Sequence, residues 1–377
     1  MQRIYLDNAA STPISSDVID VMKNLMESTY GNPSSVHSYG RQAKIIIEDA
    51  RKKIAQILNT SPGTIFFTSG GTESDNMAIN SSIKKYNIRH AITSKISHHA
   101  VLYPLQELAN DGVIELSYVD IDNDGKISVD HLETLLKEKP RSFVSIMHAN
   151  NEIGIIQDIK TIGELCKAYN AIFHSDTVQT VGHYLFNMQD LDLHFLAASA
   201  HKFHGPKGIG FVYISEEIQI NPYILGGSQE RNMRAGTESI YLIAGLAKAM
   251  EIAYENLSDD TNYIKGLKLY MINLLESEFP MLSFNGCSNN LDQTLYTVLN
   301  ISLPKNSNTE MLLFNLDIEG ISCSGGSACA SGTNMGSHVL SFLNPESNRI
   351  GIRFSFSKYN SKEDINYTVK KLKELYF

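Results

Sequence analysis

The amino-acid sequence predicts an α/β protein with a large domain, built on a mostly parallel seven-stranded sheet flanked by helices, and a smaller α+β domain. Three observations support this prediction. Between residues 64 and 215, short apolar runs alternate with helical patterns, which is typical of a parallel sheet with helices on both faces. After Gly236 this alternation ends and long helical patterns follow. A chain of 377 residues is also too long for one ordinary hydrophobic core.

The strands predicted for the large domain are short apolar runs, at residues 64–68, 90–94, 114–119, 142–148, 171–175, 193–198 and 208–214. Helices are predicted between most of them, at residues 73–86, 99–109, 129–137 and 159–169. In the third of these helices, the apolar residues fall on one face: Val129, Leu132, Leu135 and Leu136. Sheets of this kind bind ligands beyond the carboxyl ends of their strands.

In the rest of the chain, the sequence pattern predicts helices at 239–256, 263–279 and 309–319, strands at 294–302 and 349–356, and a final helix. That helix begins after Ser361 with Asp364 three residues later, which resembles a capping box. We expect residues 14–256 to form the large domain. Residues 1–13 and 257–377 would form the small domain, with a mobile loop at about 322–337.

Composition and charge exclude several classes of protein. Apolar residues make up 42% of the chain and charged residues 19%, as in ordinary folded proteins. The net charge of −9 argues against nucleic acid or an acidic membrane surface as a partner. No apolar run approaches the roughly 18 residues of a membrane span, and the first residues show no signal-peptide pattern. Four cysteines do not make a disulfide framework in a chain of this length, so we expect a cytoplasmic protein.

The strongest chemical signal lies where two predicted strands end in polar side chains. The first leads to Asp176 and Gln179, and the second to Ser199, His201 and Lys202. A lysine near a buried carboxylate is what a pyridoxal phosphate enzyme requires, because the amine forms a Schiff base and the carboxylate keeps the pyridine nitrogen protonated. A solvated lysine or a helix-capping aspartate would explain either residue alone, but not the whole cluster.

A glycine turn at Gly70 and Gly71 leads into a helix that begins with Thr72. The free N–H groups and the dipole of such a helix start favour a phosphate group. Glycine turns before helices are common without any ligand, so this interpretation depends on the lysine described above.

Three more residues each allow two interpretations. His98, at a helix start, either faces water or lies flat on the cofactor ring and shuttles protons. Asn151 either belongs to a turn or donates its amide to the phenolic oxygen of the cofactor. Arg353 interrupts an apolar strand and needs an anion, which is either a structural acid or the α-carboxylate of a substrate.

The cysteines differ in their surroundings. Cys329 lies among Gly, Ser and Ala at 324–331, which favours an exposed mobile loop and, with a Schiff base nearby, indicates sulfur chemistry on an amino acid. Cys166 falls on the apolar face of a helix and Cys287 has no marked surroundings. Cys323 and Cys329 have no further ligand at zinc spacing. We therefore predict that the chain itself has no metal site. The one exception would be a metal cluster that Cys329 shares transiently with a second protein, the acceptor.

These residues belong to a series of motifs through which the chain resembles the cysteine desulfurases of the nitrogen-fixation and iron–sulfur-cluster type. These are fold-type I pyridoxal phosphate enzymes of the class V aminotransferase family. The motifs follow in order along nearly the whole chain, at residues 5–13, 31–35, 67–76, 148–154, 199–208, 233–237, 324–331 and 352–355.

The resemblance implies a role for each position. Lys202 would bind the cofactor and move the substrate α-proton, Asp176 would pair with the pyridinium nitrogen, and His98 would stack on the ring. Asn151 and Gln179 would contact the phenolic oxygen. The phosphate would be held by Gly71, Thr72, Ser199 and His201, with Thr237 contributed by the second subunit of a homodimer.

For the reaction itself, the resemblance implies that Arg353, with Asn151, binds the carboxylate of L-cysteine. Cys329 would attack the substrate sulfur, leaving L-alanine and a persulfide for a sulfur-acceptor or iron–sulfur scaffold protein. We also hypothesise that a protonated His98 favours the thiolate of Cys329.

The chain departs from the family pattern at residues 333–336, which read Thr-Asn-Met-Gly in place of Ser-Leu-Glu-Pro, and at Cys323. Cys323 either intercepts the persulfide or packs beneath the loop. Relatives that supply scaffold proteins often have a longer tail after the last helix, so the identity of the acceptor stays open. The alternatives for function are a selenocysteine lyase, an aminotransferase, which has no use for Cys329, and a catalytically inactive interaction protein.

Overall fold

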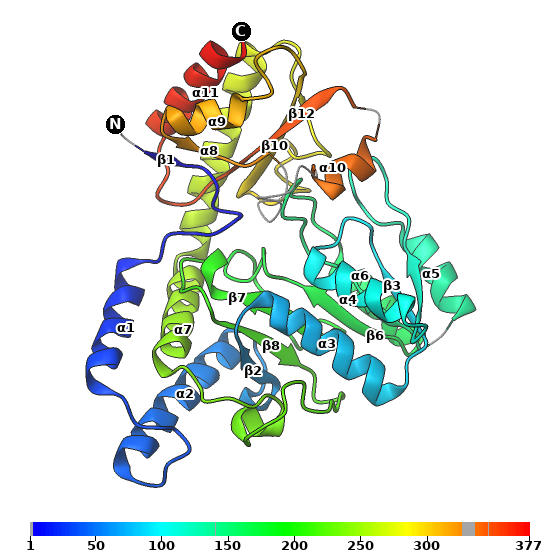
Figure 1. Ribbon diagram of the computed structural model, residues 1–377, viewed down its shortest axis with the longest axis vertical. Helices are drawn as coiled ribbons and strands as arrows, with labels where there is room; N and C mark the ends of the chain where they lie inside the picture. Colours follow the sequence, from blue (N-terminus) through cyan, green and yellow to red (C-terminus); the bar gives the residue numbers. More distant parts are fainter. Residues whose placement is uncertain (1–2, 140, 326–335, 346) are drawn as a thin grey trace.

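The computed structural model describes residues 3–139, 141–325, 336–345 and 347–377. Figure 1 shows a large α/β domain in the lower part of the view and a small α+β domain above it. The helix α8 rises from the large domain into the small one. The predicted fold class is therefore confirmed.

The large domain is built on one seven-stranded sheet with the order β2-β8-β7-β6-β5-β3-β4. Its strands are β2 (Ile65–Thr68), β3 (His90–Thr93), β4 (Glu115–Tyr118), β5 (Phe143–Ser145), β6 (Ile172–Asp176), β7 (Phe195–Ser199) and β8 (Gly210–Ile214). Strand β8 is antiparallel to both of its neighbours, whereas β7, β6, β5, β3 and β4 pair in parallel. The carboxyl ends of the parallel strands consequently meet at one edge of the sheet.

Helices cover both faces of this sheet. One face carries α3 (Gly71–Tyr86) and α4 (His99–Asn110), and the other carries α2 (Ser38–Ile57), α5 (Val129–Glu138), α6 (Ile159–Ala168) and α7 (Ile240–Glu255). Phe195 and Leu196 are neighbours on β7, yet they belong to the hydrophobic clusters of opposite faces. Successive strand side chains alternate in direction, so one continuous apolar run supplies both clusters.

The small domain has its own hydrophobic core. A three-stranded antiparallel sheet contains β9 (Ser283–Phe284), β10 (Val298–Pro304) and β12 (Arg349–Ser355). Its helices are α8 (Leu257–Glu278), α9 (Leu312–Ile318), α10 (His338–Leu343) and α11 (Lys362–Tyr376). The first residues of the chain join this core through Ile4 and Leu6, and β1 (Ile4–Tyr5) pairs in parallel with β11 (Ile321–Ser322).

The elements differ from the prediction in a few places. The strand expected at 142–148 ends at Ser145, because the chain then turns at Asn150, whose side-chain oxygen accepts from the N–H groups of Glu152 and Ile153. No element is predicted at 14–63, where α1 (Ser16–Ser28) and α2 lie. Of the described helices, none combines the length and apolar character needed to cross a bilayer.

Candidate active site

A cavity of about 360 Å³ opens at the edge of the sheet where the parallel strands end. Most of the residues that the sequence selected line it: Gly71, Thr72, His98, Asn151, Asp176, Gln179, Ser199, His201, Lys202 and Arg353. All but Arg353 follow the ends of strands β2, β3, β5, β6 and β7, and Arg353 reaches the cavity from β12 of the small domain. The volume is in the usual range of a small-molecule site.

Lys202 lies in a short helical turn directly after β7. Its ammonium group donates to the carbonyl oxygens of Ala9 at 2.6 Å and Ala10 at 2.9 Å. The N-terminal segment of the small domain therefore holds the amine that the sequence assigns to the cofactor.

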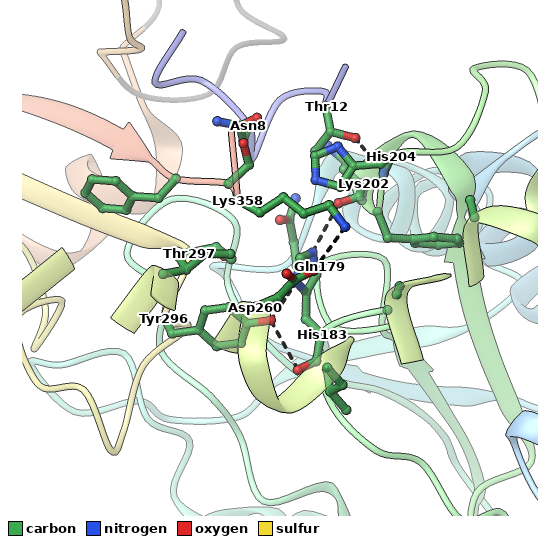
Figure 2. A pocket seen from close by; sticks show the side chains of 18 of the residues that line it. Asn8, Thr12, Gln179, His183, Lys202, His204, Asp260, Tyr296, Thr297 and Lys358 are labelled. Atoms are coloured by element: carbon green, nitrogen blue, oxygen red, sulfur yellow. Dashed lines mark hydrogen bonds and ion pairs between the residues drawn. The ribbon is translucent and has the colours of Figure 1, made fainter. Parts of the chain in front are cut away.

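Hydrogen bonds also connect the main chain of Lys202 to the small domain. His183 pairs through Nε2 with the Lys202 carbonyl oxygen at 3.1 Å and through Nδ1 with the Tyr296 hydroxyl at 2.9 Å. Figure 2 shows this cluster, in which Lys358 and Asp260 form a further ion pair at 3.1 Å. These two hydrogen bonds, from Lys202 to His183 and from His183 to Tyr296, fix the position of the lysine relative to both domains.

Asp176 ends strand β6 and is buried. One of its carboxylate oxygens accepts from the Val178 N–H at 2.9 Å. Burial raises the pKa of Asp176, while His98, this N–H group and Lys202 act in the opposite direction. A buried carboxylate in a cavity favours a cationic ligand atom, as a protonated pyridine would supply.

His98 is the N-cap of α4, and its Nδ1 accepts from the Ala100 N–H at 3.1 Å. Burial lowers the pKa of His98, so the ring is neutral with its proton on Nε2. This is unfavourable for the hypothesis that an imidazolium at His98 promotes the Cys329 thiolate. Its position on the cavity wall remains compatible with stacking and with proton transfer through Nε2.

The start of α3 has the features of an anion site. Gly70 is the N-cap, with φ +150°, and provides no side chain to cap the helix. At Gly71 a Cβ would lie 2.5 Å from Val178 Cγ2, so only glycine allows this close approach. The first N–H groups of the helix have no intrahelical acceptor, and Thr72 and Ser199 line the same end of the cavity.

His201 lies beside this end of the cavity, and its Nδ1 pairs with the Ser11 hydroxyl at 3.3 Å. Burial, together with the charges of Lys202 and Lys207, lowers the pKa of His201 to about 4. The ring is therefore a neutral donor or acceptor toward a phosphate rather than a counter-charge. Gln179 is also buried here, and its amide donates to the Ala9 carbonyl oxygen at 3.0 Å.

The two adjacent asparagines have separate environments. Asn150 is fully engaged in turn hydrogen bonds and also donates to the Ile96 carbonyl oxygen at 2.9 Å. Asn151 lines the cavity, and its own carbonyl oxygen accepts from Arg353 Nη1 at 2.9 Å. The turn interpretation therefore fits Asn150, and Asn151 is the one available to a ligand.

Arg353 is almost completely buried and pairs through Nη2 with Asp7 Oδ1 at 2.8 Å. A structural ion pair was one of the two interpretations of Arg353 from the sequence, and this ion pair is present. Arg353 Nε is buried without a hydrogen-bond partner among the described residues. A ligand carboxylate would satisfy this group and share the guanidinium with Asp7.

Cys329 lies outside the described residues, so its position is not part of the structure described here. The residues on either side of that segment do contact the site. Ser324 pairs with the Arg353 main chain and donates its hydroxyl to Asp7 Oδ1 at 2.8 Å, and His338 lines the cavity. Cys323 packs against the small-domain core, and burial raises its pKa to about 12, which favours the packing alternative.

Thr237 is exposed and does not line the cavity of its own chain. It follows a segment in which Glu230, Arg231 and Asn232 all have positive φ angles, a costly conformation for non-glycine residues. The buried pair of Arg51 with Glu230 at 2.8 Å and the pair of Arg234 with Glu73 at 2.7 Å hold this segment in place.

Four polar residues at the site were given no role by the sequence: Asp7, Asp75, Glu152 and His338. Glu152 is buried, and its carboxylate accepts from the Ser337 hydroxyl. Asp75 lies on α3 and is fully buried on the cavity wall. Both are acidic residues that lie among other polar residues within the motifs quoted above, so their place in those motifs was the signal for them.

An amine, a buried carboxylate, an imidazole and an uncapped helix start meet in one cavity, an arrangement that is compatible with a pyridoxal phosphate enzyme. The chain belongs to the class-V aminotransferase family, whose model matches residues 4–368, and within that family to the cysteine desulfurases.

Among the relatives, it is 41% identical to the cysteine desulfurase IscS of Dictyoglomus turgidum, over 99% of this chain and 94% of that protein. A solved structure of a NifS-like protein is 35% identical, with a TM-score of 0.91 over 100% of this chain and 99% of that one. The structure of SspA in complex with cysteine is 30% identical, with a TM-score of 0.80 over 96% of this chain and 100% of that one.

Proposed function

We propose that this protein is a pyridoxal-phosphate-dependent cysteine desulfurase, which converts L-cysteine to L-alanine and takes up the sulfur on Cys329 as a persulfide. The observation that carries this proposal is the single cavity in which Lys202, Asp176, His98 and Arg353 meet. The names of the relatives and the cysteine complex of SspA support cysteine as the substrate.

The residues present fit pyridoxal phosphate. The start of α3, Ser199 and His201 would hold the phosphate, Asp176 the pyridine nitrogen, and Asn151 and Gln179 the phenolic oxygen. His98 would lie against the ring, and Lys202 would bind the cofactor covalently. When bound, pyridoxal phosphate supplies an electron-withdrawing ring that makes loss of the substrate α-proton tolerable.

The chain itself supplies orientation and proton transfer. Arg353 would bind the substrate carboxylate, which fixes the α-carbon near Lys202. Lys202 Nζ would take the α-proton of the bound substrate. The Cys329 thiolate would then attack the substrate sulfur, so that an S–S bond forms as the C–S bond breaks. One cysteine and one thiol thus give one alanine and one persulfide.

Further parts of the proposal concern the whole protein. We propose that it acts as a homodimer in the cytoplasm, with the domains divided at 14–256 and at 1–13 with 257–377. The two hydrophobic cores support that division. The described cysteines, Cys166, Cys287 and Cys323, are free thiols, as expected in a reducing compartment. The persulfide would pass to a sulfur acceptor that supplies iron–sulfur clusters, as the IscS name of the relatives suggests.

The test is to supply L-cysteine with a thiol reductant and to measure alanine and sulfide. We expect equal amounts from the wild-type protein. Cys329→Ala should keep the yellow colour of bound cofactor and release no sulfide, whereas Lys202→Ala should lose both. Cys323→Ala is the matched control and should keep the wild-type rate.

Two results would contradict the proposal. Sulfide formation by Cys329→Ala at the wild-type rate would remove the nucleophile assignment. A colourless protein that does not take up pyridoxal phosphate would favour an inactive interaction protein. Selenocysteine offered in parallel tests whether the enzyme is instead a selenocysteine lyase.

A further inference from the structure

Behind Asp176 lies a second buried acidic residue that no step above uses. Asp75, on α3, is 1% exposed, and its Oδ1 lies 3.2 Å from Nε2 of His174, which is completely buried. His174 precedes Asp176 by two residues on β6, so the two side chains share one face of the strand. Asp75 also reaches the wall of the cavity that Asp176 lines.

The contact between Asp75 and His174 requires a proton. Asp75 Oδ1 and His174 Nε2 are both buried without a hydrogen-bond partner among the described residues, although they lie 3.2 Å apart. Two buried polar atoms left without partners would each destabilise the folded protein. One proton shared between them satisfies both atoms, and the other ring nitrogen of His174 pairs with the Ser145 hydroxyl at 2.8 Å.

Charge decides which of the two residues carries that proton. The pKa of Asp75 is raised well above its usual value by burial and by the charge of Asp176. Burial also lowers the pKa of His174 to about 3. The Val178 N–H group and the ammonium of Lys202 act to lower the pKa of Asp176, whereas the pKa of Asp75 is only raised by its surroundings. Two neighbouring buried carboxylates cannot both ionise cheaply, so the one without these favourable neighbours is the one that stays protonated.

We propose that Asp75 and His174 form a neutral pair in which Asp75 donates its carboxyl proton to His174 Nε2, so that Asp176 carries the negative charge of these two neighbouring carboxyl groups. Asp75 and His174 are then positioning residues, which act on the cofactor through Asp176. This inference rests on the proposed binding of pyridoxal phosphate and adds to that proposal. It explains how Asp176 keeps the negative charge that would pair with the pyridine nitrogen.

The direct measurement uses full-length protein carrying ¹³C-carboxyl aspartate and ¹⁵N-histidine, with and without pyridoxal phosphate. The Asp75 signal is assigned by its loss in Asp75→Asn. We expect a carboxylic acid at Asp75 and a neutral ring with an accepting Nε2 at His174 at neutral pH. A carboxylate signal for Asp75 under these conditions would overturn the proposal. Because the cofactor-free protein is also measured, this result does not depend on desulfurase activity.

A second measurement follows the visible absorption of bound pyridoxal phosphate as a function of pH. Asp75→Asn keeps a neutral donor to His174, so the midpoint of that titration should stay where the wild-type protein has it. Asp75→Ala removes the donor and admits water beside Asp176, so the midpoint should shift and cofactor affinity should fall by about tenfold or more.

Asp49→Asn, on the exposed surface of α2, is the control for loss of an aspartate charge. A purely structural role would lower stability in Asp75→Ala without moving the midpoint, and that result would also overturn the proposal. A shifted midpoint in Asp75→Asn would show that the negative charge of Asp75, and not its proton, is what matters.

Discussion

At the scale of single residues, the guanidinium of Arg353 has two roles, one structural and one in substrate binding. It already pairs with Asp7 and with the Asn151 carbonyl oxygen, and it would also bind the substrate carboxylate. Asp7 is partly exposed, so its pairing holds the arginine in position without closing the cavity to a second anion. The arrangement orients the guanidinium before the substrate arrives.

This arrangement predicts that Arg353→Lys raises the KM for cysteine by about tenfold or more, because an ammonium group cannot make the two parallel hydrogen bonds of a guanidinium. The yellow colour of bound cofactor should persist, since Arg353 is not expected to touch it. The measurement is steady-state kinetics with cysteine, together with the absorption spectrum of the variant. An unchanged KM would mean that Arg353 serves only its ion pair with Asp7.

Some residues of the site could be predicted from the sequence because their chemistry is local. Asp176 and Lys202 each follow an apolar strand directly, so their place at the sheet edge follows from the strand pattern alone. The contact of Asp75 with His174 could not be predicted, because it depends on how α3 packs over β6. Motif spacing along the chain contains no information on that packing.

At the scale of elements, the connection that follows β5 contains a histidine that makes the large domain sensitive to acid. His148 follows β5, is paired through Nδ1 with the Thr180 hydroxyl at 3.0 Å, and has its pKa lowered by burial to about 4. In the unfolded chain its pKa returns to about 6.5. Between these two values the unfolded state binds the additional proton, so the unfolding free energy falls as the pH is lowered.

We therefore predict that the pH dependence of stability is weaker in His148→Gln. Below about pH 6.5, His148 should remove up to about 1.4 kcal/mol of unfolding free energy per pH unit. Urea unfolding of the cofactor-free protein at pH 7.5 and 5.5, at fixed protein concentration, gives the comparison. Gln42→Ala, which changes an exposed side chain that does not titrate, is the control and should keep the wild-type dependence. Equal slopes for wild type and His148→Gln would contradict the assignment.

Elements with strong local signals were predicted well. The capping box of α11 is present, with the Ser361 hydroxyl accepting from the Asp364 N–H and the Asp364 carboxylate accepting from the Ser361 N–H. Helices α1 and α2 have amphipathic patterns as clear as that of α11, so the sequence did contain a signal for them, which the prediction did not use. Their packing on α7 depends on tertiary structure and could not be predicted from that pattern.

At the scale of the whole molecule, one predicted phosphate ligand lies away from the cavity of its own chain. Thr237 is exposed, and so are large apolar side chains such as Val36 and Leu225, which are 89% and 82% exposed. Exposed apolar surface of this kind favours association with a second copy. The pair of Arg234 with Glu73 ties the segment that carries Thr237 to the start of α3, where the chain's own phosphate site begins.

This geometry predicts complementation between two defective chains. Thr237→Ala should weaken cofactor retention, and Lys202→Ala should abolish it, in their respective homodimers. In a mixed dimer, the site of the Thr237→Ala chain has an intact Lys202 and receives an intact Thr237 from its partner. If the chains associate at random, roughly a quarter of all sites should recover wild-type affinity for pyridoxal phosphate.

The measurement is the visible absorption of retained cofactor after unfolding and refolding the two variants together, compared with the same variants refolded separately and mixed afterwards. Because no site can contain both residues on one chain, recovery occurs only if Thr237 acts across the dimer. If Thr237 acted within its own chain, refolding together would give no more colour than mixing afterwards. In this proposal, the strained segment fixed by Arg51 and Glu230 would hold the exposed Thr237 in position for a neighbouring subunit.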